Sequence, residues 1–131
     1  MNCKVEKSKI KGEINCPSNK SYTHRGIFLA SLAGNNSKVE NVLLSADTKA
    51  TIEACKKFGA VIEVNDSDII VKKSIKIGIN VPEINTENSG TTMRIAIGIA
   101  SLFSEEIILT GDTSLQKRPM QPLLDALSSI G

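Results

Sequence analysis

The sequence predicts an α/β (α+β) protein with an internal repeat, and three observations support this prediction. Segments with strand-like and helix-like patterns alternate along the chain. Short stretches recur: Thr23-His24-Arg25 matches Thr92-Met93-Arg94, and Asp47-Thr48 matches Asp112-Thr113. The chain has 131 residues, of which 40% are hydrophobic and 23% charged, as expected of one globular domain with a core.

Strands are expected where short runs of residues with strand propensity lie between turn-forming residues. These runs are Cys3–Glu6, Gly12–Asn15, Lys38–Leu43, Ala60–Val64, Asp68–Lys72 and Glu106–Leu109. The turn-forming Asn65-Asp66-Ser67 joins the fourth run to the fifth, which predicts a hairpin.

Helices are expected in the apolar runs that follow capping residues. Ser21–Ala33 contains no proline and ends near Gly34, and Thr48–Phe58 begins after Asp47. Two later segments repeat this pattern: Gly90–Phe103, and Pro119–Ile130 with proline at its first position.

Three of these helix starts carry cations without nearby carboxylates. No Asp or Glu occurs between Ile14 and Val39 or between Asn88 and Ser104, and the last helix follows Lys117-Arg118. The N-terminal end of a helix is its positive pole and has unpaired N–H groups, so cations there are mildly unfavourable. We therefore expect these starts to bind a small multivalent anion, a phosphate or a carboxylate.

The helix that follows Asp47 serves as an internal comparison. It has an acidic start, Lys56 and Lys57 in its last turn, and Gly59 as its stop, so it balances its own dipole. Ser, Thr and Asn before a helix are also ordinary caps. His24 is interpreted as a packing or hydrogen-bonding residue, because no catalytic or metal-binding partner lies at a useful spacing.

Composition excludes several other classes of protein. A net charge of +2, one Tyr and three Phe argue against a nucleic-acid-binding surface. No apolar run is long enough to span a membrane, and the polar start does not resemble a signal peptide. Cys3, Cys16 and Cys55 suggest neither a disulfide framework nor a zinc site. A cytoplasmic protein without a bound metal is expected.

Three motifs resemble those of the 5-enolpyruvylshikimate-3-phosphate (EPSP) synthase family. Pro17–Arg25 resembles the signature P-G/P-S-K-S-x-S/T-x-R, and Asn88–Arg94 is similar to N-A/S-G-T-x-x-R. Leu109–Asp112, followed by Lys117–Met120, resembles L-T-G-D…R-P-M/I. The motifs occur in family order and span nearly the whole chain. Asn19 and Ile95 depart from the usual residues, but neither departure removes a charged group.

The resemblance implies a reaction. Family members transfer the enolpyruvyl group of phosphoenolpyruvate to the 5-hydroxyl of shikimate 3-phosphate and release phosphate, with no metal or organic cofactor. Lys20, Ser21 and Arg25 would contact shikimate 3-phosphate. Lys20, Asn88, Gly90, Thr91 and Arg118 would contact phosphoenolpyruvate. Lys20 would also act in catalysis by relaying a proton, and Arg94 would organise the site.

The resemblance also implies an architecture. Family members have two domains, each made of three βαβαββ units, with the active site between the domains. Residues 14–73 would form a first unit and 80–131 a second, while 1–13 would supply a strand to the other domain. Because family chains are much longer, 1–131 would be an N-terminal portion, an incomplete domain that supplies half of the cleft. It would need the remainder of the enzyme chain for activity.

Two other functions remain open. UDP-N-acetylglucosamine enolpyruvyl transferases share the architecture, but they typically have K-N-A where this chain has Lys20-Ser21-Tyr22. A phosphate-binding module without catalysis would also have cationic helix starts.

Overall fold

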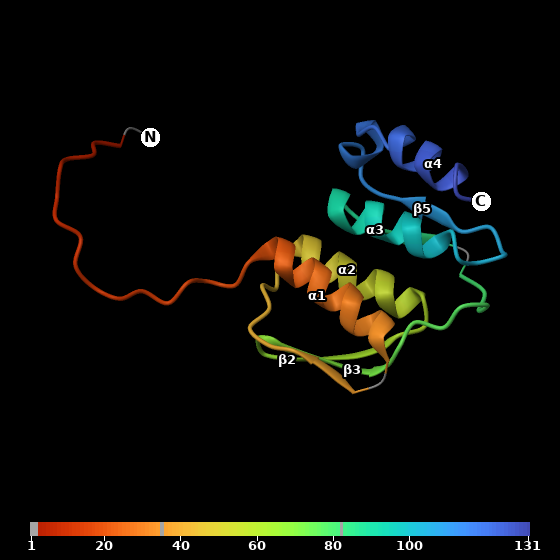
Figure 1. Ribbon diagram of the computed structural model, residues 1–131, viewed down its shortest axis with the longest axis horizontal. Helices are drawn as coiled ribbons and strands as arrows, with labels where there is room; N and C mark the ends of the chain where they lie inside the picture. Colours follow the sequence, from red (N-terminus) through yellow and green to blue (C-terminus); the bar gives the residue numbers. More distant parts are fainter. Residues whose placement is uncertain (1–2, 35, 82) are drawn as a thin grey trace.

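The computed structural model describes residues 3–34, 36–81 and 83–131 (Figure 1). Its helices are α1 (Lys20–Ala33), α2 (Ala46–Lys57), α3 (Gly90–Ala100), the short 3-10 helix η1 (Leu115–Lys117) and α4 (Gln121–Ser128). Its strands are β1 (Ser37–Val39), β2 (Val61–Asn65), β3 (Asp68–Lys73), β4 (Glu83–Asn85) and β5 (Ile108–Thr110). None of the helices in these ranges has the length and apolar character needed to span a membrane.

The helices begin on one side of the molecule. In Figure 1 the first turns of α1, α2 and α3 all lie on the left of the folded body, where the N-terminal segment leaves it. Helix α1 packs on α2, and α2 packs on α3. The positive poles of three neighbouring helices are therefore brought to the same side.

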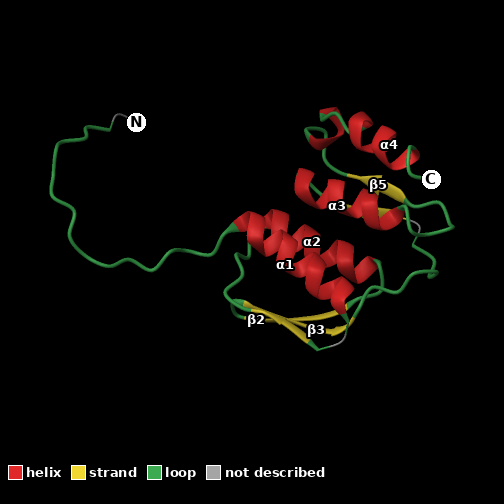
Figure 2. Cartoon of the chain, in the orientation of Figure 1, coloured by secondary structure: helices red, strands yellow, loops and turns green. Residues whose placement is uncertain are grey.

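Two small sheets accompany the helices. β1, β3 and β2 form an antiparallel sheet in that order, with Ser37 opposite Val71 and Asn65 opposite Asp68. β4 and β5 are parallel, with Ile84 opposite Leu109. Figure 2 shows the first sheet on one side of α1 and α2, and β5 between α3 and α4. The elements α1–β1–α2 and α3–β5–α4 follow the same order along the chain.

One apolar core joins the helices to the sheets. Phe58, Ile27, Ile69 and Val71 are buried within it, and the Phe58 ring lies 5.5 Å from that of Phe103. This contact joins the end of α2 to the chain that follows α3, so it fixes the relative position of the two helices.

Local signals explain where the helices begin and end. Asn19 and Ser89 cap α1 and α3, and Ser45 forms a capping box with Thr48 at α2. Gly59, at a φ of 95°, follows the end of α2 and donates its N–H to Lys56 O. The predicted helices over Ser21–Ala33, Thr48–Phe58 and Gly90–Phe103 are confirmed as α1, α2 and α3, although α3 ends earlier, at Ala100. The predicted hairpin is also confirmed as β2 and β3.

The strands predicted at Cys3–Glu6 and Gly12–Asn15 are wrong. Residues 3–19 have no regular secondary structure and extend away from the folded body (Figure 1). Val5, Ile10 and Ile14 are 91%, 99% and 88% exposed. A strand forms only beside a partner strand, and within the described ranges nothing pairs with this segment.

Other boundaries differ from the prediction. The strand expected over Lys38–Leu43 ends at Val39, because the chain turns at Asn41. Asn41 has a φ of 51°, and its backbone N–H donates to Asp68 Oδ1. The last helix begins at Gln121 with Pro122 in its first turn, so Pro119 is not its first residue. The strand expected over Glu106–Leu109 is β5. β4 was not predicted because three residues are too few for an alternating pattern to be recognised.

Candidate anion-binding site

The start of α3 lies beneath two guanidinium groups. A methyl group added at Gly90 would lie 2.9 Å from Arg94 Nη1 and 3.0 Å from Arg118 Nη1. Because glycine has no side chain, both arginines can approach the first turn of the helix this closely. Two positive charges therefore lie beside the positive pole of α3.

Asn88 holds Arg118 in place. Arg118 Nη2 donates to Asn88 Oδ1 at 2.6 Å, and Asn88 Nδ2 donates to Asp112 Oδ2 at 2.5 Å. Asp112 Oδ1 in turn accepts from the Leu115 amide at 2.7 Å. The Leu115 hydrogen bond is the largest cause of the lowered pKa of Asp112, and it outweighs desolvation, which raises the pKa. The Asn88 side chain, the Ser114 amide and the Arg118 charge lower it further. Asp112 is thus an ionised anchor for the asparagine that orients the arginine.

Arg94 connects α3 to the segment before α4. Its Nη1 lies 3.3 Å from the Gly90 carbonyl oxygen and its Nη2 lies 3.5 Å from that of Pro119, and it donates to both. Arg94 thus links the first turn of α3 to the chain before α4, and its organising role stays a prediction.

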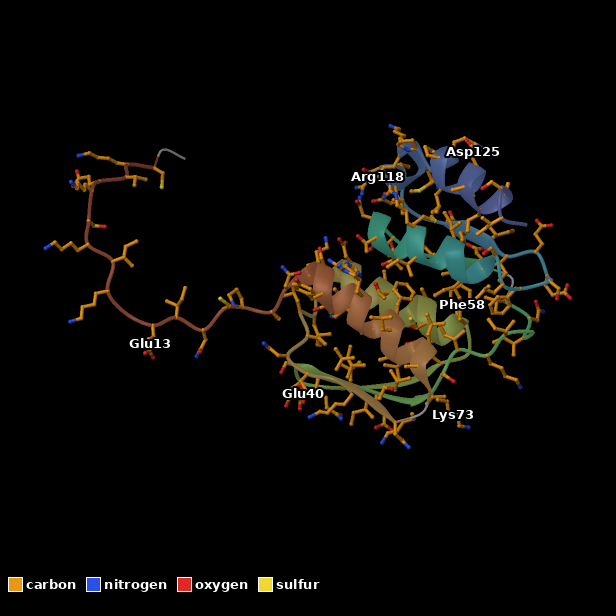
Figure 3. All side chains as sticks on the ribbon, viewed as in Figure 1. Glu13, Glu40, Phe58, Lys73, Arg118 and Asp125 are labelled. Carbon is orange, nitrogen blue, oxygen red and sulfur yellow. The ribbon has the colours of Figure 1, made fainter. Side chains whose placement is uncertain are left out.

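No carboxylate of the described residues balances the arginines near Gly90 by a direct ion pair. In the described part of the chain, no ion pair includes Arg94 or Arg118. Figure 3 shows Arg118 near the first turn of α3. Fixed guanidinium groups beside unpaired helix N–H groups form a site suited to phosphate or carboxylate oxygens.

The start of α1 presents a second group of polar side chains. Asn19 Oδ1 accepts the Tyr22 amide at 3.0 Å, and Lys20 and Ser21 in the first turn are exposed. Arg25 Nε donates to Ser21 O at 3.2 Å, and its guanidinium carbon lies 5.2 Å from the centre of the Tyr22 ring. Backbone and ring together hold Arg25 close to Ser21.

The expectation that the start of α1 has no acidic partner is wrong for Lys20. Its ammonium forms an ion pair with Asp47, which lies in the first turn of α2. Sequence reasoning assigned Asp47 only to the dipole of its own helix, because the two residues are far apart in the sequence. Their pairing follows from the side-by-side starts of α1 and α2.

Buried polar groups connect the two helix starts. His24 Nδ1 lies 2.6 Å from Thr51 Oγ1, which confirms the expected hydrogen-bonding role of His24. Burial is the largest cause of the lowered pKa of His24, followed by the Lys20 charge, while Asp47 opposes both. Thr51 Oγ1 lies 2.7 Å from Thr92 Oγ1 in α3.

The structure therefore groups the predicted site residues in two places. Lys20, Ser21 and Arg25 lie at the start of α1, while Asn88, Gly90, Thr91 and Arg118 surround the start of α3. Sequence reasoning missed Asp47 as the partner of Lys20 and Asp112 as the anchor of Asn88. The sequence marked Asp112 through its match to Asp47 in the repeat and through the Leu109–Asp112 motif, but neither signal indicated its contact with Asn88.

A cavity of about 740 Å³ lies beside the α3 site, between α3, β5 and α4. Apolar side chains form most of its lining, among them Met93, Ile97 and Leu124, and Arg118 also contributes. It is not an anion site itself, because most of its lining is apolar.

The fold and the site define an α/β protein with cationic side chains gathered near the starts of α1 and α3. The chain belongs to the EPSP synthase (3-phosphoshikimate 1-carboxyvinyltransferase) family, whose sequence description matches residues 5–131.

Curated relatives and solved structures agree with this assignment. A Nitrosopumilus maritimus protein named 3-phosphoshikimate 1-carboxyvinyltransferase is 82% identical over 131 residues, which are 100% of this chain and 31% of that protein. A Methanococcus maripaludis protein of the same name is 49% identical over 125 residues, 94% of this chain and 29% of its own length. An EPSP synthase structure from Acinetobacter baumannii superimposes with a TM-score of 0.81 and 30% identity, covering 92% of this chain and 28% of that one. The chain thus spans less than a third of the length of these relatives.

Proposed function

We propose that this chain forms one side of the active site of an enzyme that transfers the enolpyruvyl group of phosphoenolpyruvate to the 5-hydroxyl of shikimate 3-phosphate. Family membership and the names of the relatives support this function. The observation that carries the proposal is the pair Arg94 and Arg118, which lie close to Gly90 and form no ion pair with any carboxylate of the described residues. Both substrates carry phosphate and carboxylate groups that such a site would attract.

Each of the two groups of side chains would bind one of the two substrates. Lys20, Ser21 and Arg25 would hold shikimate 3-phosphate at the start of α1. Asn88, Gly90, Thr91 and Arg118 would hold phosphoenolpyruvate at the start of α3, with Lys20 reaching both substrates. Binding requires Lys20 to exchange its partner Asp47 for a substrate anion.

The same groups would favour the reaction. In the addition, the methylene carbon of phosphoenolpyruvate gains a proton while the hydroxyl loses its own and attacks the adjacent carbon. The tetrahedral product then loses a proton from the new methyl group and expels phosphate, which restores the carbon–carbon double bond. Fixed cations hold two anions side by side although these repel each other in water, and they stabilise the negative charge of the intermediate. Lys20 is the group of this chain that we assign to moving a proton.

We also propose that α1–β1–α2–β2–β3 and β4–α3–β5–α4 belong to two related units, 14–73 and 80–131, of a larger enzyme. Their shared order of elements supports this division. The unpaired state of Cys3, Cys16 and Cys55 supports a reducing compartment, the cytoplasm.

Turnover tests the proposal directly. The 131-residue chain should release no phosphate from the two substrates, because it provides only one side of the site. A chimera in which it replaces the matching segment of the Nitrosopumilus maritimus relative should do so. Arg118→Ala should lower the turnover of the chimera by about a hundredfold, since a preorganised donor is lost. Lys117→Ala, which removes a neighbouring exposed cation, should change it little.

Ligand binding separates the alternatives. Calorimetric titration of the chimera should detect shikimate 3-phosphate and not UDP-N-acetylglucosamine. Binding of UDP-N-acetylglucosamine would favour the related transferase. Binding of inorganic phosphate without turnover would instead indicate a module that only binds anions.

A further inference from the structure

Tyr22 is an aromatic residue that the fold leaves outside the core. It lies in the first turn of α1 and is 72% exposed. Aromatic rings contribute most to stability where they are buried, so packing of the core does not explain a ring at this position. The contact that the ring does make is with Arg25, whose guanidinium carbon lies over it at 5.2 Å from the ring centre.

Helix geometry brings Arg25 back over the preceding turn. Side chains of a helix lean toward its N-terminal end, so a residue meets those three and four positions before it. Arg25 therefore reaches the ring of Tyr22, and its Nε donates to the Ser21 carbonyl oxygen at 3.2 Å. Within the described ranges the Arg25 side chain forms no ion pair, and its two terminal nitrogens donate to no protein group.

The second copy of the repeat holds its arginine differently. Arg94 matches Arg25, and its Nη1 donates to the Gly90 carbonyl oxygen, again four positions earlier. The residue three positions before Arg94 is Thr91, which has no ring, and the other contact of Arg94 is a hydrogen bond from Nη2 to Pro119 O. Arg94 thus uses both terminal nitrogens in contacts with the protein, whereas Arg25 uses neither.

A ring holds a guanidinium group without occupying its terminal N–H groups. The attraction of a cation to an aromatic face comes from the ring quadrupole and needs no hydrogen-bond donor. Nη1 and Nη2 of Arg25 therefore stay available, and together they match two oxygens of one phosphate group. Lys20 shows the other arrangement, because it has to leave the carboxylate of Asp47 before it can bind an anion.

We propose that Tyr22 is a positioning residue that holds the guanidinium of Arg25 ready for the phosphate of shikimate 3-phosphate. The ring restricts a long side chain before the substrate arrives, so less conformational freedom is lost on binding. Tyr22 acts through Arg25 and needs no contact with the substrate itself. This role rests on the proposed function, which makes Arg25 a ligand of shikimate 3-phosphate, whereas the contact between ring and guanidinium does not.

Proton NMR of the 131-residue chain tests the contact. Tyr22 is the only tyrosine and the chain has no tryptophan, so the ring signals need no assignment by mutation. Protons that lie over the face of an aromatic ring shift upfield. The Cδ and Nε protons of Arg25 should therefore lie upfield in the unmodified chain and in Tyr22→Phe, compared with Tyr22→Leu. Equal positions in all three proteins would overturn the proposal.

Calorimetric titration of the chimera with shikimate 3-phosphate tests the consequence. Tyr22→Leu should bind about threefold more weakly, the size expected for an exposed contact between a cation and a ring. Tyr22→Phe keeps the ring and should bind normally, and a loss equal to that of Tyr22→Leu would assign the effect to the hydroxyl instead. The affinity for phosphoenolpyruvate, measured at saturating shikimate 3-phosphate, should be the same in all three proteins. A loss for both substrates would mean that Tyr22 only supports the fold.

A double-mutant cycle shows whether Tyr22 acts through Arg25. Arg25→Ala should weaken binding of shikimate 3-phosphate by more than about tenfold, because a charge-assisted contact is lost. In that background Tyr22→Leu should have no further effect, since the side chain that the ring holds is gone. The same threefold loss in both backgrounds would show that the tyrosine acts on its own, which contradicts the proposal.

The outcomes separate this role from the proposed function. If the unmodified chimera and Tyr22→Leu bind shikimate 3-phosphate equally well, the positioning role is wrong and the proposed function stands. If the unmodified chimera does not bind shikimate 3-phosphate, the proposed function fails, and the role of Tyr22 in binding fails with it whatever the NMR shifts.

Discussion

Asn88 accepts a 2.6 Å hydrogen bond from Arg118 and so joins the loop before α3 to the loop before α4. The same amide donates to Asp112, which places it between a cation and an anion. Asn88 therefore keeps Arg118 from pairing with the carboxylate and leaves the guanidinium available to a ligand.

Removing the Asn88 side chain should weaken anion binding. In Asn88→Ala we expect Arg118 to turn toward Asp112, and the affinity for phosphoenolpyruvate to fall by about tenfold, because a charge-assisted contact is lost. Calorimetry on the chimera measures the change. Asn85→Ala removes an amide that contacts Glu87 instead and should bind normally. Equal losses in both variants would show that Asn88 has no special role.

A methyl group at Gly90 should affect binding more than stability. Gly90→Ala pushes against the ends of the Arg94 and Arg118 side chains, which can turn away only by giving up the hydrogen bonds that hold them. We expect a native-like melting temperature and about tenfold weaker binding of phosphoenolpyruvate. Gly98→Ala lies in the same helix with nothing within 4 Å of the added methyl, so it should gain about 0.5–1 kcal/mol of stability and keep its affinity. Unchanged binding in Gly90→Ala would contradict the site geometry.

Stability should depend on pH through His24. Its pKa lies below the ordinary value of 6.5 in the native state, so the unfolded chain binds a proton that the native chain does not. The free energy of unfolding should fall as the pH drops below about 6.5, by at most about 1.4 kcal/mol per pH unit. Urea denaturation between pH 7.5 and about 5, above the main carboxylate range, measures this slope. His24→Gln should lose the slope whatever its absolute stability, and an unchanged slope would assign the effect to other groups.

The three thiols should differ in reactivity. Cys3 and Cys16 are exposed, while burial raises the pKa of Cys55 to about 12. A chromogenic disulfide reagent should therefore modify the first two quickly and Cys55 only when the chain unfolds. Cys55→Ala should remove the slow phase and leave the fast phase intact. A third fast thiol in the unmodified chain would mean that the core around Cys55 opens readily.

Sequence reasoning identified the elements whose signals are local. α1, α2 and α3 are long apolar runs with caps and stops next to them, and the β2–β3 hairpin has a clear turn. The strands expected before Asn19 failed because a strand also needs a neighbour, which no local pattern supplies. β4 is too short to show a period.

The site was predictable in its residues and not in its contacts. Lys20 and Gly90 stand out as a cation and a glycine at helix starts, where the structure also places them, whereas Arg118 lies after η1 and before α4. The partners Asp47 and Asp112 depend on which helices and loops lie side by side. In the sequence, Thr51 and Thr92 are ordinary threonines of predicted helices. Their contacts with His24 and Ser89 can be seen only in the folded chain.

The exposed segment 3–19 enters α1 at the Asn19 cap, one residue before Lys20. A pull or twist on this tail would act first on the opening turn of the helix, and so on the distance between the lysine ammonium and Asp47. The segment is thus joined directly to the turn that carries the Lys20–Asp47 ion pair, so a partner that binds residues 3–19 would also affect the position of that lysine.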